Sequence, residues 1–313
     1  MRKRILGNTG LEVSEIGFGA WQLGNVTDWG GMDDACAHTL VAEALDLGVT
    51  LFDTAPHYAK TNSERLLGEA LVGRRDDVVL VSKFGHSHDG RKDYRVDSFQ
   101  RSLAESLERL RTDHLDVLLL HNPPLDMLQG RDPLWDALEV ERNEGRIRHY
   151  GVSLDFAHEI EACLANTGSS VLEVLFNILH QDARRAFSHV EANGAGVIAK
   201  VPLDSGWLTG RFHATSRFEG VRARWTKQEI QQRAECIAGL DWLVAEGQPL
   251  SQRALAYPLA YPVVSSVIPG TRSLAQLHDS VGAVDCRIED HERERLETYW
   301  NVITDHGERL LPW

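Results

Sequence analysis

Two hydrophobic patterns alternate along the chain. Short runs rich in leucine and β-branched residues stand between longer segments in which apolar residues recur every three or four positions. The short apolar runs are typical of buried strands, and the longer period is typical of amphipathic helices. We therefore predict strands at residues 15–18, 49–53, 78–82, 115–120, 147–152, 172–176, 196–199 and 263–268.

Helical periodicity fills the intervals between these strands. The predicted helices span residues 33–47, 62–72, 95–111, 132–143, 155–165, 183–193, 227–246, 250–257 and 273–283. Strand and helix thus alternate with a repeat of roughly 30 to 40 residues, which indicates an α/β fold with a parallel sheet. Eight predicted strands fit a closed (β/α)8 TIM barrel better than an open doubly wound sheet.

The connections between these elements predict how the chain is organised. No stretch rich in proline, glycine or serine divides it, so we expect residues 1–313 to form one barrel domain. Three segments are longer than plain connections need, at residues 86–94, at residues 204–226 and in the tail after Arg287. Because loops at the carboxyl ends of barrel strands surround the active site, we expect these segments to cap that face.

Charge and hydropathy narrow the possible partners. Lys and Arg total 33 against 46 Asp and Glu, a formal net charge of −13, which provides no general positive field for nucleic acid. The basic start at residues 1–4 is not followed by the apolar region of a secretory signal, and no apolar run is long enough to span a membrane. We expect a cytoplasmic protein with neither nucleic-acid nor membrane partners.

Cysteine and histidine spacing gives no sign of a metal site. Fourteen histidines are present, but the close pair His86 and His88 falls in a loop rich in glycine and aspartate. We therefore expect no bound metal. We expect free thiols at the four cysteines, which stand far apart without a C-x-x-C pair: Cys36, Cys163, Cys236 and Cys286.

Four polar residues stand at or just after the carboxyl ends of three successive predicted strands. Asp53 and Tyr58 follow the second strand, Lys83 ends the third and His121 ends the fourth. Catalytic groups of barrel enzymes project from these ends. No G-x-G-x-x-G sequence follows the first strand, so a dinucleotide would be bound otherwise than in a Rossmann fold.

These residue types predict a proton-transfer site. A phenol titrates at about pH 10, so we expect the Lys83 charge to lower the pKa of Tyr58 and Asp53 to hold Lys83. His121 would orient a carbonyl group or share its proton, while a nicotinamide cofactor would supply the hydride. Taken singly, each residue is more often a helix cap, a surface group or a core residue. The prediction depends on their joint spacing.

Sequence motifs spread over nearly the whole chain accompany these residues. They are Gly17-Phe18-Gly19, Phe52-Asp53-Thr54-Ala55-x-x-Tyr58, Ser63-Glu64-x-x-Leu67-Gly68, Ser82-Lys83, Asp116-Val117-Leu118-x-x-His121, Gly151-Val152-Ser153, Pro202-Leu203-x-x-Gly206 and Ile268-Pro269-Gly270. In this combination the sequence closely resembles the aldo-keto reductase family, in its bacterial type. The resemblance implies an oxidoreductase that transfers a hydride between NAD(P)(H) and a carbonyl or alcohol substrate.

The resemblance also implies residue roles. Asp53, Tyr58, Lys83 and His121 match the family's catalytic tetrad, with Tyr58 as general acid and base. Residues 202–211 match the loop over the pyrophosphate and residues 270–280 the adenosine end. The implied cofactor-binding residues are Gly19, Ala20, Trp21, Asp53, Ser153 at the nicotinamide carboxamide, Glu173, Lys200, Pro202, Leu203, Ser205, Gly206, Leu208, Gly210, Arg211, Gly270, Arg272, Gln276, Asp279 and Ser280.

Several positions depart from the family pattern. They are Leu154 where Asn is frequent, Glu173 for Gln, Lys200 for Tyr, Gly270 for a basic residue, Gln276 for Arg and Ser280 for Asn. Arg211 and Arg272 remain as partners for a 2′-phosphate. We therefore expect NADP(H) in preference to NAD(H).

Two alternatives stay open. The same site working in reverse would make the protein an NAD(P)-dependent dehydrogenase of a sugar or another alcohol. A protein of another class, a reductase-like accessory subunit of an ion channel, would also keep the barrel, although the intact tetrad argues against it. Neither the substrate nor the oligomeric state follows from the sequence. Candidates for lining the substrate pocket, with ordinary packing as the alternative, are Trp21, Trp29, Phe84, His86, Trp207, Trp300 and Trp313.

Overall fold

Parallel strands form the centre of the molecule in a computed structural model, which describes residues 1–26, 30–87, 89–244 and 247–312. Within these residues one sheet has eight strands, and each strand pairs with its neighbours in chain order. The strands are β3 Phe18–Gly19, β4 Leu51–Asp53, β5 Val79–Phe84, β6 Leu115–His121, β7 Ile147–Leu154, β8 Val171–Leu175, β9 Gly196–Lys200 and β10 Val264–Val267.

The sheet closes on itself between the chain's first and last parallel strands. The Gly17 amide donates to the Val267 carbonyl at 2.8 Å, and the Val267 amide donates to the Glu15 carbonyl at 2.9 Å. Gly19 likewise donates to the Pro269 carbonyl at 3.1 Å. Closure leaves no open edge, and the fold is the predicted (β/α)8 barrel.

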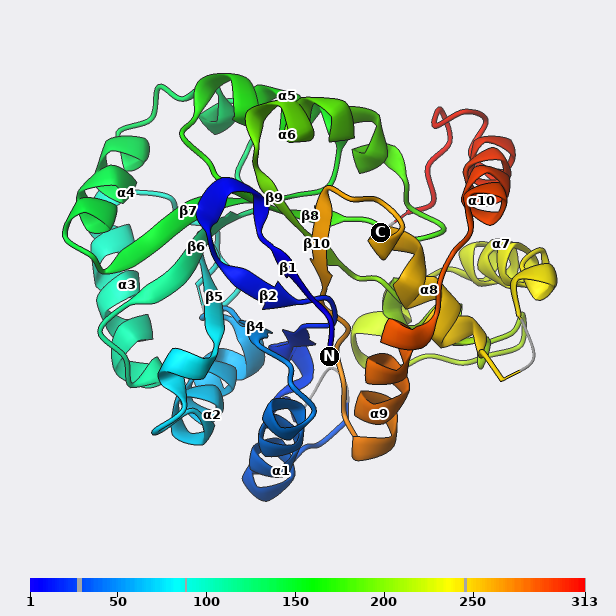
Figure 1. Ribbon diagram of the computed structural model, residues 1–313, viewed down its shortest axis with the longest axis horizontal. Coiled ribbons are helices and arrows are strands. Elements are labelled where there is room, and N and C mark those ends of the chain that lie inside the picture. Colours follow the sequence, from blue (N-terminus) through cyan, green and yellow to red (C-terminus); the bar gives the residue numbers. More distant parts are fainter. Residues whose placement is uncertain (27–29, 88, 245–246, 313) are drawn as a thin grey trace.

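Helices surround the strands as an outer ring (Figure 1). They cover the outward faces of a parallel sheet, which is why its strands are apolar on both sides. The helices are α1 Asp34–Asp46, α2 Asn62–Ala70, α3 Val96–Leu110, α4 Leu134–Asn143, α5 Ala157–Asn166, α6 Phe187–Asn193, α7 Lys227–Ala238, α8 Leu250–Leu259, α9 Leu274–Gly282 and α10 Asp290–Ile303. No described helix is both long and apolar enough to cross a membrane.

Two short strands that the hydrophobic pattern did not predict lie over one end of the barrel (Figure 1). Strands β1 Lys3–Ile5 and β2 Glu12–Ser14 form an antiparallel hairpin. The Arg4 guanidinium donates to the carbonyls of Leu259, at 2.8 Å, and Val264, at 2.9 Å. Each strand has only three residues, which is too short to show an alternating pattern in the sequence.

The inner core of the barrel follows from the two-residue period of its strands. Alternate residues of a strand face opposite sides of the wall. Leu51, Val81, Leu119, Val171 and Ile198 pack together in the interior, whereas their neighbours in sequence pack against the helices. Two positions further along the same strands, the period places the next inward side chains, which are Asp53, Lys83, His121, Glu173 and Lys200.

The C-terminal half contains the largest differences from the predicted elements. The helix expected over 227–246 ends at Ala238, and residues 245–246 lie outside the described part of the chain. The tail after Arg287 forms α10, which lies outside the barrel beside α7 and α8 (Figure 1). Tyr299 in α10 donates to the Cys236 carbonyl at 2.8 Å. The expectation that this tail caps the active site is therefore wrong for its described residues.

The cysteines are free thiols, as the sequence predicts. All four cysteines are free, with Cys36 exposed and the other three buried. Helices α1, α5 and α7 carry three of them, and Cys286 follows the last turn before α10. Burial raises the pKa of the Cys163 and Cys236 thiols, so these two are held as unreactive core groups.

A buried carboxylate joins α2 to the sheet and to α3. Glu64 is fully buried and accepts a hydrogen bond from the Ser82 hydroxyl at 2.7 Å, next to Lys83 in β5. Its second oxygen pairs with the Arg109 guanidinium of α3 at 2.7 Å. Glu64 therefore fixes the end of the strand that carries Lys83.

Replacing Glu64 is expected to destabilise the fold. Glu64→Ala should lower the free energy of unfolding by about 3 kcal/mol, because Ser82 and Arg109 lose a buried partner. Urea denaturation followed by circular dichroism measures this loss. The matched control is Glu105→Ala, which removes an exposed carboxylate 3.6 Å from the same Arg109 and should change stability by less than about 1 kcal/mol. Equal losses in the two variants would contradict the anchoring role.

Candidate active site

The carboxyl ends of the strands carry a layer of charged and polar side chains on top of the apolar interior. Asp53, Lys83 and Glu173 are buried there, and Asp53 and Glu173 reach the wall of the main cavity. Tyr58 reaches the same wall from the loop after β4. The structure thus brings the predicted tetrad together with Glu173.

The Lys83 ammonium lies between two carboxylates. It is in close contact with the Asp53 carboxylate and lies 3.1 Å from Glu173 Oε2. It also donates to the Thr54 carbonyl at 3.2 Å. Burial opposes the charge, but Asp53 and Glu173 outweigh burial and raise the pKa of Lys83. Lys83 is therefore a permanent cation in this site.

Two carboxylates share this one ammonium. Burial raises the pKa of Asp53, and the charge of Glu173 raises it further, against the effect of Lys83. Burial also opposes ionisation of Glu173, but Lys83 and then Lys200 lower the pKa of Glu173 below its ordinary value. The two acids compete for Lys83, as expected for like charges at close range.

An unusual backbone conformation holds Tyr58. Residues 59–61 all have positive φ, at 49°, 53° and 76°. This conformation is disfavoured for residues other than glycine, and such strain clusters at functional sites. It places the Tyr58 ring 6.2 Å from the Trp21 ring, between centroids, and 5.3 Å from the Lys83 nitrogen.

The pKa of Tyr58 differs from the expectation. Burial raises the pKa of Tyr58 above its ordinary value, Lys83 offsets only part of the effect, and Asp53 and Glu173 add to the rise. The prediction that Lys83 leaves Tyr58 with a lowered pKa is therefore wrong for this structure. The phenol is held in its protonated form, which suits a proton donor.

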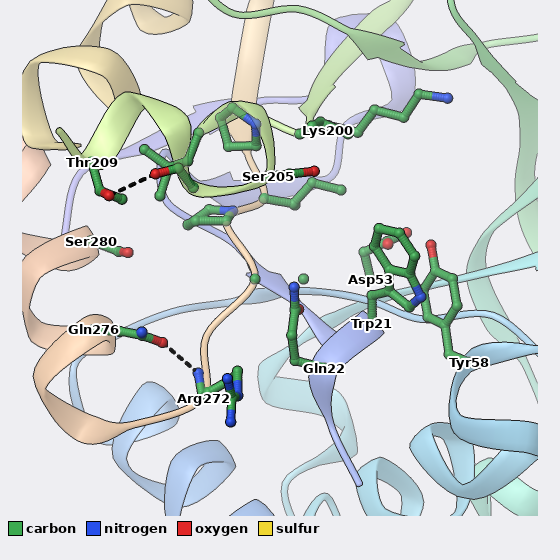
Figure 2. A pocket seen from close by; sticks show the side chains of 18 of the residues that line it. Trp21, Gln22, Asp53, Tyr58, Lys200, Ser205, Thr209, Arg272, Gln276 and Ser280 are labelled. Atoms are coloured by element: carbon green, nitrogen blue, oxygen red, sulfur yellow. Dashed lines mark hydrogen bonds between the residues drawn. The ribbon is translucent and has the colours of Figure 1, made fainter. Parts of the chain in front are cut away.

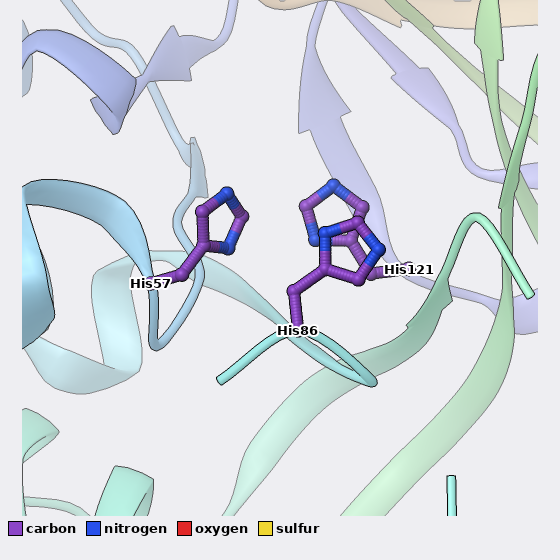
Figure 3. Close-up of side chains that lie close together, drawn as sticks. All are labelled: His57, His86 and His121. Atoms are coloured by element: carbon purple, nitrogen blue, oxygen red, sulfur yellow. The ribbon is translucent and has the colours of Figure 1, made fainter. Parts of the chain in front are cut away.

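Three imidazoles meet beside Tyr58, at the ends of successive strands (Figure 3). His57, His86 and His121 each offer a ring nitrogen, and these atoms lie within 4.8 Å of one another. Burial, aided by nearby positive charge, lowers the pKa of His57 to about 3, that of His86 to about 4 and that of His121 well below its usual value. All three rings are therefore neutral at neutral pH. His57 Nδ1 and His86 Nε2 have no hydrogen-bond partner among the described residues.

The orientation of these rings disfavours a shared metal ion. Three neutral imidazoles are a common zinc ligand set. The His86 and His121 rings, however, lie face to face, with centroids 4.4 Å apart and an interplanar angle of 7°. Nitrogen lone pairs lie in the ring plane, so those of two stacked rings run parallel instead of converging. As placed, the rings provide hydrogen-bonding groups in the cavity wall.

A second polar network lies across the cavity from Tyr58. The Lys200 ammonium donates to Ser153 Oγ at 2.8 Å and pairs with Asp155 at 2.9 Å. Ser153 Oγ in turn donates to Glu173 Oε1 at 3.3 Å. Lys200 also donates to Asn122 Oδ1 at 3.3 Å. An alternating series of charges thus runs from Asp155 through Lys200 and Glu173 to Lys83.

A cavity of about 1000 Å³ extends from Tyr58 to the start of α9. Figure 2 shows Trp21, Asp53 and Tyr58 on one side of it and Arg272, Gln276 and Ser280 on the opposite side. Gly270 also lines this cavity, and a Cβ atom there would come within 2.0 Å of Gln22 Oε1. A cavity that extends from Tyr58 to α9 fits an extended ligand such as a dinucleotide.

Positive charge gathers at the α9 end of this cavity. Arg211, Arg222 and Arg272 all line it. Burial, together with the charges of Arg211, Arg272 and Arg224, lowers the pKa of Arg222 to about 10. Arg222 donates to the Ser205 carbonyl at 2.8 Å. Arg222 belongs to no recognised motif, and its place in the long segment 204–226 was the one indication of a role at the site.

Most of the residues that the resemblance assigned to a cofactor line this cavity. The exceptions are Ala20 and Leu208, which are buried in the core, Gly210, which is exposed, and Ser153, which is buried. The lining residues are Gly19, Trp21, Asp53, Glu173, Lys200, Pro202, Leu203, Ser205, Gly206, Arg211, Gly270, Arg272, Gln276, Asp279 and Ser280.

Only some of the aromatic residues expected in the substrate pocket line the cavity. Trp21 and His86 line the cavity, but Phe84, Trp207 and Trp300 are buried in the core and do not. Trp29 and Trp313, like His88, lie outside the described residues. Four polar lining residues that the sequence did not indicate are His57, Lys92, Asn122 and Asp155. Of these, only His57 and Asn122 are next to a predicted residue in sequence.

Comparisons with known proteins agree with this architecture. Residues 15–301 match the model of the aldo/keto reductase family. An L-galactose dehydrogenase of Arabidopsis thaliana is 32% identical over 290 residues, which cover 90% of this chain and 87% of the relative. A "Probable voltage-gated potassium channel subunit beta" of Oryza sativa subsp. japonica is 30% identical, with 91% and 92% covered. The solved holo form of aldo-keto reductase AKR11C1 from Bacillus halodurans superposes with a TM-score of 0.82 at 29% identity, covering 96% of each chain.

The barrel, its strand-end site and these matches define a (β/α)8-barrel oxidoreductase. The chain belongs to the aldo/keto reductase family. Nicotinamide cofactors and carbonyl substrates are general for that family. The cavity residues fit such a cofactor, because a single cavity is lined both by Tyr58 and by Arg211, Arg222 and Arg272.

Proposed function

We propose that the protein catalyses NAD(P)(H)-dependent reduction of an aldehyde or ketone, and its reversal, with Tyr58 as general acid and base. The observation that carries this proposal is the buried, protonated Tyr58 at the cavity wall, with the Lys83 ammonium 5.3 Å from its ring centroid. The nicotinamide supplies the hydride when the cofactor is bound. Tyr58 donates the proton that the developing alkoxide needs.

The neighbouring residues have distinct roles in this proposal. Lys83 stabilises negative charge that develops at the Tyr58 oxygen after proton transfer, and Asp53 holds Lys83 in place. His121, neutral because it is buried, offers a ring nitrogen to the carbonyl oxygen of the substrate. Trp21 packs beside Tyr58 and forms one wall of the reaction end.

We also propose NADP(H) as the preferred cofactor. Arg272 and Arg211 are exposed at the mouth of the cavity, and Arg222 adds a third guanidinium. Helix α9 begins there with Ser273 as its cap, so backbone amides and guanidinium groups face the same region. Together they would bind the diphosphate and the 2′-phosphate. This end of the site would hold the adenosine part of the cofactor.

The polar reaction end supports a second candidate function, oxidation or reduction of a hydroxylated substrate such as a sugar. Three neutral imidazoles, Asn122 and Lys200 line the same cavity as Tyr58. A hydroxylated substrate would satisfy the partnerless nitrogens of His57 and His86, which an alkyl or aryl aldehyde would leave unpaired. The 32% identical L-galactose dehydrogenase makes a sugar a reasonable first substrate to assay. The channel-subunit alternative is less well supported, because it gives no role to this site.

The hydroxyl of Tyr58 is the first group to test. Tyr58→Phe should lower turnover by about 10²- to 10⁴-fold at saturating cofactor, because it deletes only the proton donor. Single-turnover oxidation of bound NADPH by a reactive aldehyde such as a nitrobenzaldehyde measures the chemical step. Tyr299→Phe is the matched control, because Tyr299 packs outside the barrel. Equal rates in wild type and Tyr58→Phe would refute the role of Tyr58.

Cofactor preference depends on Arg272. Arg272→Ala should weaken NADPH binding by about 10- to 100-fold and leave NADH binding nearly unchanged, because only NADPH carries the 2′-phosphate. Fluorescence titration of both cofactors measures this difference. Arg131→Ala, an exposed arginine outside the cavity, is the control. An equal loss of affinity for both cofactors would show that Arg272 contacts a part of the cofactor other than the 2′-phosphate.

The hydroxylated-substrate candidate depends on His86. His86→Phe keeps an aromatic ring to stack on His121 but removes both nitrogens. We expect kcat/KM for glyceraldehyde to fall by about 5- to 100-fold and that for propanal to change little. His158→Phe, an exposed histidine outside the cavity, is the control. A uniform change for both aldehydes would argue against recognition of hydroxyl groups by this ring.

A further inference from the structure

Glu173 is a buried acid that the proposed proton transfer does not use. It stands on β8, across the barrel from Tyr58, and only 2% of its surface is exposed. One carboxylate oxygen lies 3.1 Å from Lys83 Nζ, and the other accepts from Ser153 Oγ at 3.3 Å. Lys83 already has Asp53 as a close partner. One carboxylate, that of Asp53, is enough to keep Lys83 charged and in place, so Glu173 must have a different effect on the site.

The charges around Tyr58 show what the second carboxylate changes. Asp53 from β4 and Lys83 from β5 would form a neutral pair, and Glu173 from β8 adds a second acidic group to the same ammonium. From β9, Lys200 contributes a positive charge, but Asp155 pairs with it at 2.9 Å. Among the described residues, three imidazoles also lie beside Tyr58. The ring centroids of His57 and His121 are 4.7 and 6.2 Å from that of Tyr58, His86 stacks on His121, and all three rings are neutral.

We propose that Glu173 is a positioning residue that offsets the Lys83 charge and thereby keeps Tyr58 protonated over a wide range of pH. This inference rests on the proposed function of Tyr58 as the proton donor. Forming a Tyr58 phenolate would add a negative charge to a buried site in which two acidic groups, Asp53 and Glu173, already share the Lys83 ammonium. The donor form is favoured accordingly, and the site is biased towards reduction.

The electrostatic direction supports this role. A nearby negative charge disfavours ionisation of a phenol, and a nearby positive charge favours it. Glu173 contributes to the rise in the pKa of Tyr58, and Lys83 opposes that rise. Removing the Glu173 charge would leave Lys83 opposed by Asp53 alone. Tyr58 would then lose its proton at lower pH. The rate of reduction would therefore decline at lower pH, and a larger fraction of Tyr58 would be present as the phenolate base that the reverse oxidation needs.

The test measures the proton affinity of residue 58 directly and needs no turnover. Tyr58 is replaced site-specifically by 3,5-difluorotyrosine, whose phenol titrates at lower pH than that of tyrosine, and ¹⁹F NMR follows its ionisation in the protein alone. In Glu173→Gln the midpoint should fall by about one pH unit or more, a tenfold or larger rise in the proton dissociation constant. Glu173→Asp, which keeps the charge, should restore most of the wild-type midpoint.

The matched control is Glu141→Gln. Glu141 is also buried and paired with an arginine, Arg146, but it lies on α4 and outside the cavity lining. Its replacement makes the same change in charge and should leave the midpoint in place. If Glu173→Gln does not fold, Glu173→Met removes the same charge with a side chain of similar size. A midpoint in the Glu173 variant equal to that of Glu141→Gln would overturn the proposal.

Reaction rates measured as a function of pH test the role of Glu173 separately from the proposed function. With natural Tyr58, the decline of the reduction rate at high pH should begin at least one unit lower in Glu173→Gln than in wild type, and oxidation at neutral pH should be faster. A shifted midpoint in a protein that reduces no carbonyl compound would refute the proposed function and leave the electrostatic role of Glu173 in place. If the Glu173→Gln enzyme is active and its pH profile equals that of wild type, the role of Glu173 is refuted and the proposed reductase function is unaffected.

Discussion

The site depends on one geometric constraint, the two-residue period of strands in a closed barrel. Each strand places every second side chain inside, so the interior is built in layers. Leu51, Val81, Leu119, Val171 and Ile198 fill it with apolar packing. One layer higher the same strands present Asp53, Lys83, His121, Glu173 and Lys200. Charged groups from strands far apart in sequence thus share one small volume inside the barrel, where a buried charge needs a partner of opposite charge.

That balance explains why the polar residues of this layer form a connected series. A buried lysine loses its charge unless carboxylates stabilise it, and Lys83 has two of them. Ser153 connects Glu173 to Lys200 by hydrogen bonds, and Lys200 pairs with Asp155 in turn. The residues at positions 173 and 200 therefore act together. The departures of Glu173 and Lys200 from the family pattern belong to a single electrostatic arrangement.

How much of this the sequence could predict depends on the range of the interactions. The strand–helix alternation and the tetrad follow from local patterns, and the barrel and the gathering of these residues were both predictable. The hairpin strands β1 and β2 have three residues each, too few to show a pattern. Helix α10 begins with the polar run 290–295 and was not predicted, although Leu296, Trp300 and Ile303 have helical spacing. The burial that raises the pKa of Tyr58, and the stacking of His86 on His121, depend on side chains from several strands. Trp207 and Trp300 looked like pocket residues because a tryptophan in a loop or tail gives no sign of how deeply it packs.

The strained backbone around the cavity shows how the rest of the fold supports the site. Positive φ angles occur at residues 59–61 after Tyr58, at Val201 and at residues 204–205. Left-handed backbone in a β-branched residue such as Val201 is unfavourable by itself, so the surroundings must fix it. Asp204 is completely buried, where it pairs with the equally buried Arg233 at 3.3 Å, and Arg233 also donates to the Pro312 carbonyl. The cavity wall at residues 204–209 is therefore held by α7 and by the end of the chain, which gives the tail a structural role even though it does not line the cavity.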